Sequence, residues 1–190
     1  MRIIGGTLKG RSIKFLRNSN TRPLKDNVKE NIFNILNHSI FIKTKIANSK
    51  ILDLYSGIGS FGIECLSRGA EKVYFIEKDI VAMSVLEENL INLSIISKSK
   101  TYVNSIEDVL TEGINEKFDI FFFDPPFADL NFLDNLKILK KKKIYNKNHL
   151  VIIHRDKKSK DGLENLLEII NIKQYGRSKI IFGVFNWVIV

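Results

Sequence analysis

The feature that most constrains the fold of this chain is a series of short, predominantly apolar segments from residue 50 onward. They cover residues 51–55, 73–76, 118–123 and 150–153, and segments with helical spacing of their apolar residues separate them. Strands that are apolar on both faces and alternate with helices are typical of a parallel sheet that helices cover on both sides. We therefore expect an α/β fold built on a mostly parallel sheet.

The other segments extend this pattern towards both ends of the chain. Apolar residues at helical spacing predict a helix over residues 26–37, with Asp26 as its N-cap. Further helices are expected after Gly62 and at residues 80–93, 107–110, 132–139 and 162–170, and a short strand at 100–104. Residues 172–175 and 180–190 are expected to close the sheet as an antiparallel hairpin, and residues 1–22 to form a short β-hairpin. We divide the chain into a basic N-terminal hairpin and helix, residues 1–49, and a main domain, residues 50–190.

Composition excludes several classes of protein. The chain has 190 residues, 44% of them hydrophobic, which is enough for one ordinary domain with a real core. It contains no apolar run of about eighteen residues, so we expect no membrane span, and its first residues lack the apolar stretch of a signal peptide. Cys65 is the single cysteine and cannot form an internal disulfide, which makes a cytoplasmic location the expected one.

The positive charge is concentrated at the N-terminus. The formal net charge is +9, and the first fifty residues hold eleven Lys and Arg against only two acids, Asp26 and Glu30. Residues 51–190 hold nineteen of each sign. A general bias towards lysine would spread the excess along the chain, whereas a basic segment on a neutral body is typical of a protein that binds a polyanion. We therefore expect a nucleic-acid partner, contacted by residues 1–49.

A glycine-rich motif follows the first apolar strand. Gly57, Gly59 and Gly62 lie where a strand would turn into a helix, and Glu77 ends the next strand. Ligands bind at this edge of an open α/β sheet, and glycines let them approach the backbone. The spacing also satisfies the dinucleotide-binding pattern, so the motif by itself admits either a nicotinamide cofactor or S-adenosylmethionine.

Asp53 favours S-adenosylmethionine over the nicotinamide. It stands inside the end of the first strand, and a buried carboxylate needs a partner, which the ammonium group of the methionine moiety would supply. No neighbouring residue suggests hydride chemistry. Glu77 can accept hydrogen bonds from ribose hydroxyls in either case.

The tetrapeptide Asp124-Pro125-Pro126-Phe127 directly follows the apolar segment at residues 118–123 and carries the chemistry. Two prolines fix the backbone and remove two N–H donors, which leaves the Asp124 carboxylate and the Pro125 carbonyl as acceptors. Two acceptors on the hydrogens of an aromatic amine orient its nitrogen towards a methyl donor, and Asp124 can take up the proton that must leave. Phe127 offers a face on which a base can stack. The tetrapeptide predicts amine methylation on any base, or even on a protein amide.

Three alternatives stay open at this point. A DNA adenine-N6 methyltransferase would use the same tetrapeptide, although no separate base-recognition domain is visible in the chain. A NAD-binding oxidoreductase would use the same glycine motif. A non-catalytic RNA-binding module would need only the basic segment and a bound cofactor.

With both motifs placed, the chain resembles the RsmD-type 16S rRNA guanine-N2 methyltransferases over nearly its whole length. The opening residues 1–11 and the Thr21-Arg22-Pro23 segment are specific to that family. Segments shared more widely are residues 31–36, 52–57, 66–70, 77–79, 124–127, 156–157 and 175–176.

The resemblance implies a class I S-adenosylmethionine-dependent methyltransferase fold: a Rossmann-like, seven-stranded, mostly parallel sheet whose last strand is antiparallel, with a small N-terminal β-hairpin and helix. It implies S-adenosylmethionine as methyl donor and the exocyclic N2 of a guanine in 16S rRNA as target, presented in a small-subunit particle to a monomeric enzyme. By position, the methionine end of the cofactor would contact Asp53, Ser56, Gly57 and Gly59, and its ribose would contact Glu77. The RNA phosphates would contact Arg2, Lys9, Arg11 and Arg22. Asp124, Pro125, Pro126 and Phe127 would hold the guanine amino group.

The chain departs from the family pattern at three places. Phe127 stands where tyrosine is usual, which removes a hydroxyl and keeps the stacking face. Ser105 stands where an acid commonly faces the adenine amino group, and its hydroxyl can still accept a hydrogen bond. His154-Arg155 replaces the usual Glu-His pair, so no role is assigned to His154, nor to His38 or His149. No spacing of residues suggests a metal site.

Overall fold

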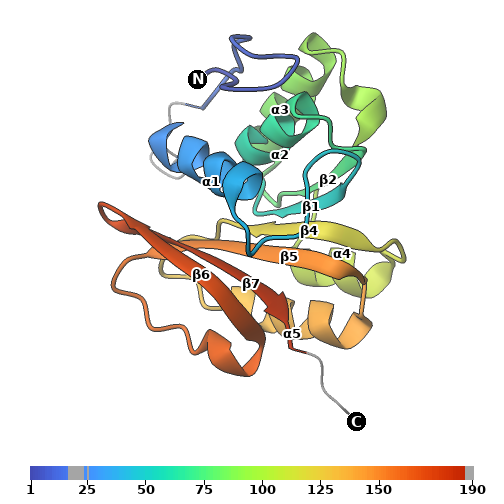
Figure 1. Cartoon of the computed structure of the whole chain (residues 1–190). Coiled ribbons are helices and arrows are strands. Elements are labelled where there is room, and N and C mark those ends of the chain that lie inside the picture. Colours follow the sequence, from blue (N-terminus) through green and yellow to red (C-terminus); the bar gives the residue numbers. More distant parts are fainter. Residues whose placement is uncertain (17–23, 25, 187–190) are drawn as a thin grey trace.

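A seven-stranded sheet forms the centre of the computed structural model, which describes residues 1–16, 24 and 26–186 (Figure 1). The strands lie in the order β3-β2-β1-β4-β5-β7-β6. Their bounds are β1 Lys50–Leu54, β2 Lys72–Ile76, β3 Ser99–Tyr102, β4 Phe118–Phe123, β5 Tyr145–Asp156, β6 Leu167–Tyr175 and β7 Ser178–Phe185.

The pairing of the strands confirms the expected α/β class. Strand β1 pairs in parallel with both β2 and β4, and β2–β3 and β4–β5 are parallel as well. Strand β7 runs antiparallel to β5 and to β6, so it is the one reversed strand of the sheet. The chain leaves β1 towards β2 and β3 and then returns to the other side of β1 with β4. Ligands bind at such a switch point, beside the carboxyl ends of the strands.

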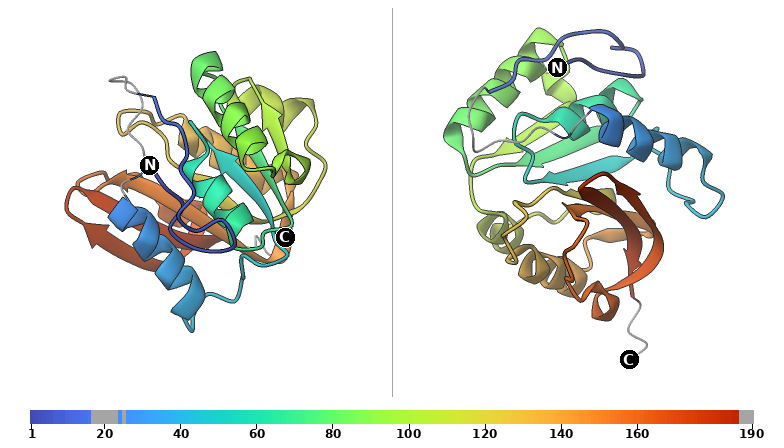
Figure 2. Two further views of the ribbon diagram at one scale, coloured as in Figure 1. Left: turned by 90° about the horizontal axis from the view of Figure 1, so that it is seen from above. Right: turned by 90° about the vertical axis from the view of Figure 1, so that its left-hand side faces the viewer.

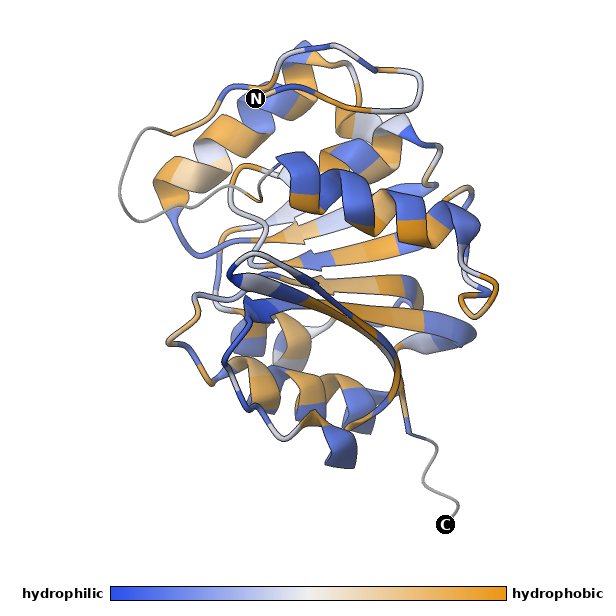
Figure 3. Cartoon of the chain, turned by 60° about the vertical axis from the view of Figure 1, so that its left-hand side comes forward, coloured by the Kyte–Doolittle hydropathy of each residue, from blue (hydrophilic) through white to orange (hydrophobic). Residues whose placement is uncertain are grey.

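Helices cover both faces of the sheet, as Figures 1 and 2 show. Helices α1 (Asp26–His38), α2 (Ser60–Ser67) and α3 (Ile80–Asn92) share one apolar core with the sheet, and α4 (Ile106–Glu112) and α5 (Phe132–Lys142) share the other. Most hydrophobic residues of these helices face the sheet (Figure 3), which the helical spacing of apolar residues predicts, whereas Ile80, Val81 and Ile91 of α3 are exposed. None of the helices in the described part of the chain is both long and apolar enough to cross a bilayer.

The prediction of a helix at residues 162–170 is wrong. Residues Leu163–Asn165 form a single 3-10 turn, and the chain then continues as strand β6. The apolar residues of this segment fit the period of a helix as well as that of a strand with a bulge, and a register shift does occur between Ile169 and Asn171. Pairing with β7 along its whole length decides for the strand.

The N-terminal segment forms less sheet than expected. Within residues 1–16, one isolated antiparallel bridge joins Arg2 and Ser12 in place of two extended strands. Side chains of Ile3 and Ile13 are buried in the same core as α1, α2 and α3, so packing on the helices substitutes for strand pairing. The remainder of the predicted hairpin, with the turn at Thr21-Arg22-Pro23, lies outside the described residues.

Two smaller differences concern helix ends and loops. Helix α1 begins at Asp26, which therefore lies in the first turn and not before it. The expected loop over residues 57–62 is shorter, because α2 already begins at Ser60 and contains Gly62.

Candidate active site

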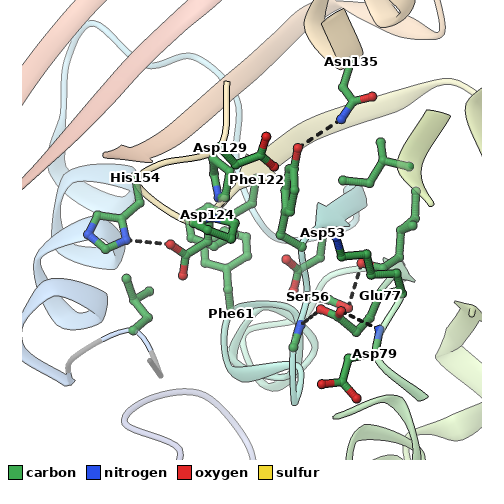
Figure 4. Close-up of a pocket in the computed structure, with 18 of the residues that line it drawn as sticks. Asp53, Ser56, Phe61, Glu77, Asp79, Phe122, Asp124, Asp129, Asn135 and His154 are labelled. Atoms are coloured by element: carbon green, nitrogen blue, oxygen red, sulfur yellow. Dashed lines mark hydrogen bonds and ion pairs between the residues drawn. The ribbon is translucent and has the colours of Figure 1, made fainter. Parts of the chain in front are cut away.

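A cavity of about 1320 Å³ opens at the carboxyl edge of the sheet (Figure 4). Many of the residues that line it follow or end the five neighbouring parallel strands, while Leu16, Leu24 and Val28 line it from the N-terminal part of the chain. Those at the strand ends include Tyr55 after β1, Glu77 after β2, Ser105 after β3, Asp124 after β4 and His154 near the end of β5. Segments far apart in the sequence thus meet at the switch point that the strand order creates.

The glycine loop between β1 and α2 forms one wall of the cavity. Gly57 and Gly59 have φ angles of 53° and 82°, in the left-handed region that favours glycine. A Cβ atom on Gly57 would meet nothing within 4 Å, so this backbone is open to a ligand. Gly59 is different, because a Cβ there would lie 2.2 Å from Leu86 Cδ1. Gly57 faces the cavity, whereas Gly59 allows α3 to pack closely.

Gly62 serves helix–sheet packing. A Cβ atom at this position would lie 2.2 Å from Cε1 of Phe75 on strand β2. The Gly62 N–H also donates a hydrogen bond to Asp53 Oδ2 at 3.0 Å. The third glycine of the motif therefore holds α2 against the sheet and anchors the carboxylate at the end of β1.

Asp53 is buried at the base of the cavity. Burial raises the pKa of its carboxyl group well above the usual value, and the nearby carboxylates of Asp124 and Glu77 raise it further, while the Gly62 N–H opposes the shift. A cationic group placed beside Asp53 would stabilise its ionised form. The chemistry of this position is thus compatible with an ammonium ligand, which stays a prediction.

Glu77 and the two serines hold the backbone around the cavity. The two carboxylate oxygens of Glu77 accept hydrogen bonds from Gly57 N at 2.8 Å and from Asp79 N at 2.9 Å. Ser56 donates to the carbonyl of Ile76, and Ser105 caps α4 by accepting from Asp108 N. Five of the six predicted cofactor residues line the cavity: Asp53, Ser56, Gly57, Glu77 and Ser105. No three His, Cys, Asp or Glu side chains in the described ranges are grouped as metal ligands would be.

The tetrapeptide forms the opposite wall. Asp124, Pro125, Pro126 and Phe127 all line the cavity, because β4 pairs with β1 and delivers them beside the glycine loop. Pro126 accepts a hydrogen bond from Asp129 N at 2.8 Å, which closes the turn after the tetrapeptide. The structure therefore brings the two motifs of the sequence analysis into one cavity.

His154 is a site residue to which the sequence assigned no role. Its Nδ1 lies 2.7 Å from Asp124 Oδ1, and its ring meets Phe127 edge to face with centroids 5.4 Å apart. A carboxylate oxygen can only accept, so Nδ1 carries the proton of this hydrogen bond. Its Nε2 is buried and has no partner among the residues that the structure describes. The available sequence signal was its place at the end of an apolar strand beside β4.

Arg155 is the second residue that the sequence left unassigned. It is buried, and its guanidinium donates to the carbonyl oxygens of Pro126 and Phe127, each at 3.1 Å. The same group pairs with Asp161 at 3.1 Å and lies over the ring of Phe132, 4.5 Å from its centroid. Neighbours in the sequence thus point to different parts of one turn: His154 holds the carboxylate of Asp124, and Arg155 holds the backbone that follows it.

Comparison with known proteins identifies the family of the chain. The family model described as Conserved hypothetical protein 95 matches residues 1–184. The chain belongs to this family, the RsmD-type methyltransferases.

Individual relatives of this RsmD-type chain match over most of their length. Ribosomal RNA small subunit methyltransferase D of Buchnera aphidicola subsp. Acyrthosiphon pisum is 33% identical over 156 residues, which is 82% of this chain and 78% of the relative. The Bacillus subtilis protein YlbH is 31% identical over 159 residues, 83% of each chain. The solved structure of HI0767 from Haemophilus influenzae superposes with a TM-score of 0.74 at 30% identity and covers 96% of each chain.

The structure separates the basic residues expected to contact RNA in this RsmD-type chain. Thr7 N and Leu8 N bond to Ser67, in the last turn of α2, whereas the first turn of that helix lines the cavity. Lys9 and Arg11 follow in the same exposed turn, and Arg11 donates to the carbonyl of Asn92. Eight helical residues span about 12 Å, so this turn lies at the end of α2 away from the cavity. Arg2 is exposed, and Arg22 lies outside the described residues.

Proposed function

We propose that this protein transfers a methyl group from S-adenosylmethionine to the exocyclic N2 of a guanine in 16S rRNA. One observation carries the proposal: the tetrapeptide Asp124–Phe127 and the glycine loop face each other across one cavity in a chain of the RsmD-type family. The name of the Buchnera relative, a small-subunit rRNA methyltransferase, supports the choice of RNA. The guanine and its nitrogen rest on the resemblance of the chain to that family.

The residues of the first wall fit S-adenosylmethionine. The open backbone at Gly57 and the buried carboxyl group of Asp53 suit the methionine moiety with its ammonium group, and Glu77, which lines the same cavity, would hold the ribose. When bound, the molecule supplies a methyl group that its sulfonium has already activated. Positioning the acceptor nitrogen is therefore the main task left to the protein.

The tetrapeptide supplies that positioning. The Asp124 carboxylate and the Pro125 carbonyl accept the two hydrogens of the amino group, and Phe127 provides a face for the base. The nitrogen lone pair forms the new N–C bond as the C–S bond breaks, and one amino proton leaves to Asp124. Because His154 occupies Oδ1 of Asp124, Oδ2 is the oxygen left for the substrate; no described residue bonds to it.

In this mechanism His154 is a positioning residue. A hydrogen bond to a charged partner contributes about 1.5–3 kcal/mol, so replacing His154 by phenylalanine is expected to lower kcat for methyl transfer by about 10- to 100-fold. His154→Asn, whose amide can donate in place of Nδ1–H, is expected to recover most of that loss. Steady-state kinetics at saturating substrate would measure both variants.

The control for the His154 variants is a histidine outside the cavity. His38→Asn changes an exposed histidine at the end of α1 and should leave kcat unchanged. Equal losses in the Phe and Asn variants would show that His154 only fills space, and an active Phe variant would remove the hydrogen bond from the mechanism.

The proposed reaction is tested by offering the purified protein labelled S-adenosylmethionine with 16S rRNA, with small-subunit particles and with duplex DNA. Nucleoside analysis by mass spectrometry should find N2-methylguanosine in the rRNA or the particles. N6-methyladenine in the DNA would establish the rival methyltransferase instead. In calorimetry we expect S-adenosylhomocysteine to bind. Tight binding of NAD together with no binding of S-adenosylhomocysteine would favour the oxidoreductase.

A further inference from the structure

A second basic surface lies at the rim of the cavity, far in the sequence from the basic N-terminus. It consists of the loop at residues 157–161, after β5, and the tip of the β6–β7 hairpin at residues 175–178. Because β7 runs antiparallel to β5, its first residue, Ser178, pairs with Asp156 at the end of β5. Lys157 N also donates to the carbonyl of Arg177 at 2.8 Å. Both segments therefore lie at the carboxyl edge of the sheet, where the cavity opens, and Arg177 and Ser178 line it.

The exposed charges of this surface are almost all positive. Its exposed cations are Lys157, Lys158, Lys160 and Arg177. Of the two acids in the loop and at its start, Asp161 is nearly buried and pairs with Arg155. Asp156 is partly exposed and accepts a hydrogen bond from Lys158 N. Lys157, Lys158 and Lys160 are close neighbours in a part of the chain, residues 51–190, that carries no net charge, and the pairing of β5 with β7 adds Arg177 to them.

Hydrogen bonds fasten the surface to the tetrapeptide. The guanidinium of Arg155 donates hydrogen bonds both to the carbonyls of Pro126 and Phe127 and to the carboxylate of Asp161. Ser159 Oγ donates to the other oxygen of Asp161 at 2.8 Å, and Lys179 donates to the carbonyl of Ser159. The basic loop, the hairpin tip and the turn that would hold the base are thus linked by a continuous series of contacts.

We infer that Lys157, Lys158, Lys160 and Arg177 bind the phosphates of the RNA that flanks the target base. The inference rests on the proposed function, because a base held by Asp124 and Phe127 requires its own backbone to cross the rim of the cavity. Lysine and arginine contacts to phosphates position a nucleic acid without reading its sequence. The turn with Lys9 and Arg11 lies at the other end of α2 and contacts more distant RNA. The surface at residues 157–161 and 175–178 therefore sets the approach of the target nucleotide.

The test replaces all four residues by glutamine and measures binding of deproteinised 16S rRNA across a salt series. Each lost phosphate contact should reduce the slope of log K against log salt by about 0.7–0.9, so the quadruple variant should lose roughly 3 units of slope. The KM for rRNA should rise, while the affinity for S-adenosylhomocysteine stays unchanged. Thermal unfolding would verify that the variant is folded, as expected for exposed positions.

A matched control removes the same charge from the opposite edge of the sheet. Lys45, Lys117, Lys141 and Lys147 are exposed and lie before β1, before β4, at the end of α5 and near the start of β5. Replacing these four by glutamine should leave the salt slope nearly unchanged. Equal losses of slope in the two variants, or no loss in the first, would overturn the inference.

The binding measurement tests the RNA-contacting surface, and the methylation measurement tests the proposed reaction. A wild-type protein that binds rRNA through this surface but methylates none would overturn the proposed reaction and leave the surface standing. Robust methylation with an unaltered slope in the quadruple variant would overturn the surface alone. The same salt series can be measured with an acidic polypeptide in place of rRNA. If the quadruple variant loses as much slope with the polypeptide as with rRNA, the surface would be assigned to a protein partner and the RNA contact refuted.

Discussion

Replacing Asp124 by alanine is expected to lower kcat for methyl transfer by about 10²–10⁴-fold, the usual contribution of a positioned acid–base group. The variant loses both the acceptor that orients the amino group and the base that receives its proton. His154 then also loses the partner of its Nδ1. Single-turnover methylation of rRNA at saturating S-adenosylmethionine would measure the loss directly.

Two further variants make the result specific. Asp124→Asn keeps an oxygen acceptor but cannot take up a proton, so it should recover little activity. Asp129→Asn changes another carboxylate that lines the same cavity outside the tetrapeptide and should retain the wild-type rate. Binding of S-adenosylhomocysteine should persist in all three. An unchanged methylation rate in Asp124→Ala would remove this carboxylate from the mechanism.

The second large effect is expected on stability. Arg155→Met removes the guanidinium that pairs with Asp161 and bonds to the backbone of Pro126 and Phe127. Removing one partner of a buried ion pair leaves an uncompensated charge and costs about 3–5 kcal/mol. We therefore expect the free energy of unfolding, measured by urea titration, to fall by about that amount.

The partner residue and a neighbour provide the controls. Arg155→Met combined with Asp161→Leu removes both charges, so the double variant should be more stable than Arg155→Met alone. Lys157→Met, at the exposed residue two positions along the chain, should change the free energy of unfolding by about 0.5 kcal/mol or less. If Arg155→Met were as stable as the wild type, the contacts of Arg155 would not hold the tetrapeptide turn.

The basic N-terminus shows the limit of a charge tally. Counting Lys and Arg along the chain predicted that residues 1–49 meet the nucleic acid, but the tally cannot say which end of the molecule a residue occupies. The structure places Lys9 and Arg11 away from the cavity and a second group of cations at its rim. Electrostatic attraction depends on position in space, which only the packing of distant segments defines.

The segment at residues 162–170 shows a second limit, of local periodicity. Its closely spaced apolar residues fit a helix, yet it forms an edge strand because β7 offers a complete row of backbone partners. Long-range pairing of this kind is absent from the local pattern, and it overrides weak helical preference.

The sequence by itself determined the alternation of buried strands and helices, the parallel sheet and the two motifs at strand ends. These depend on local apolar periodicity and on the conformations that glycine and proline allow, both of which are properties of neighbouring residues. Only the tertiary structure decided that His154 meets Asp124, that Arg155 holds the tetrapeptide backbone and that Arg177 reaches the cavity. Each of these joins segments that belong to, follow or connect different strands, and the register of the sheet brings such segments together.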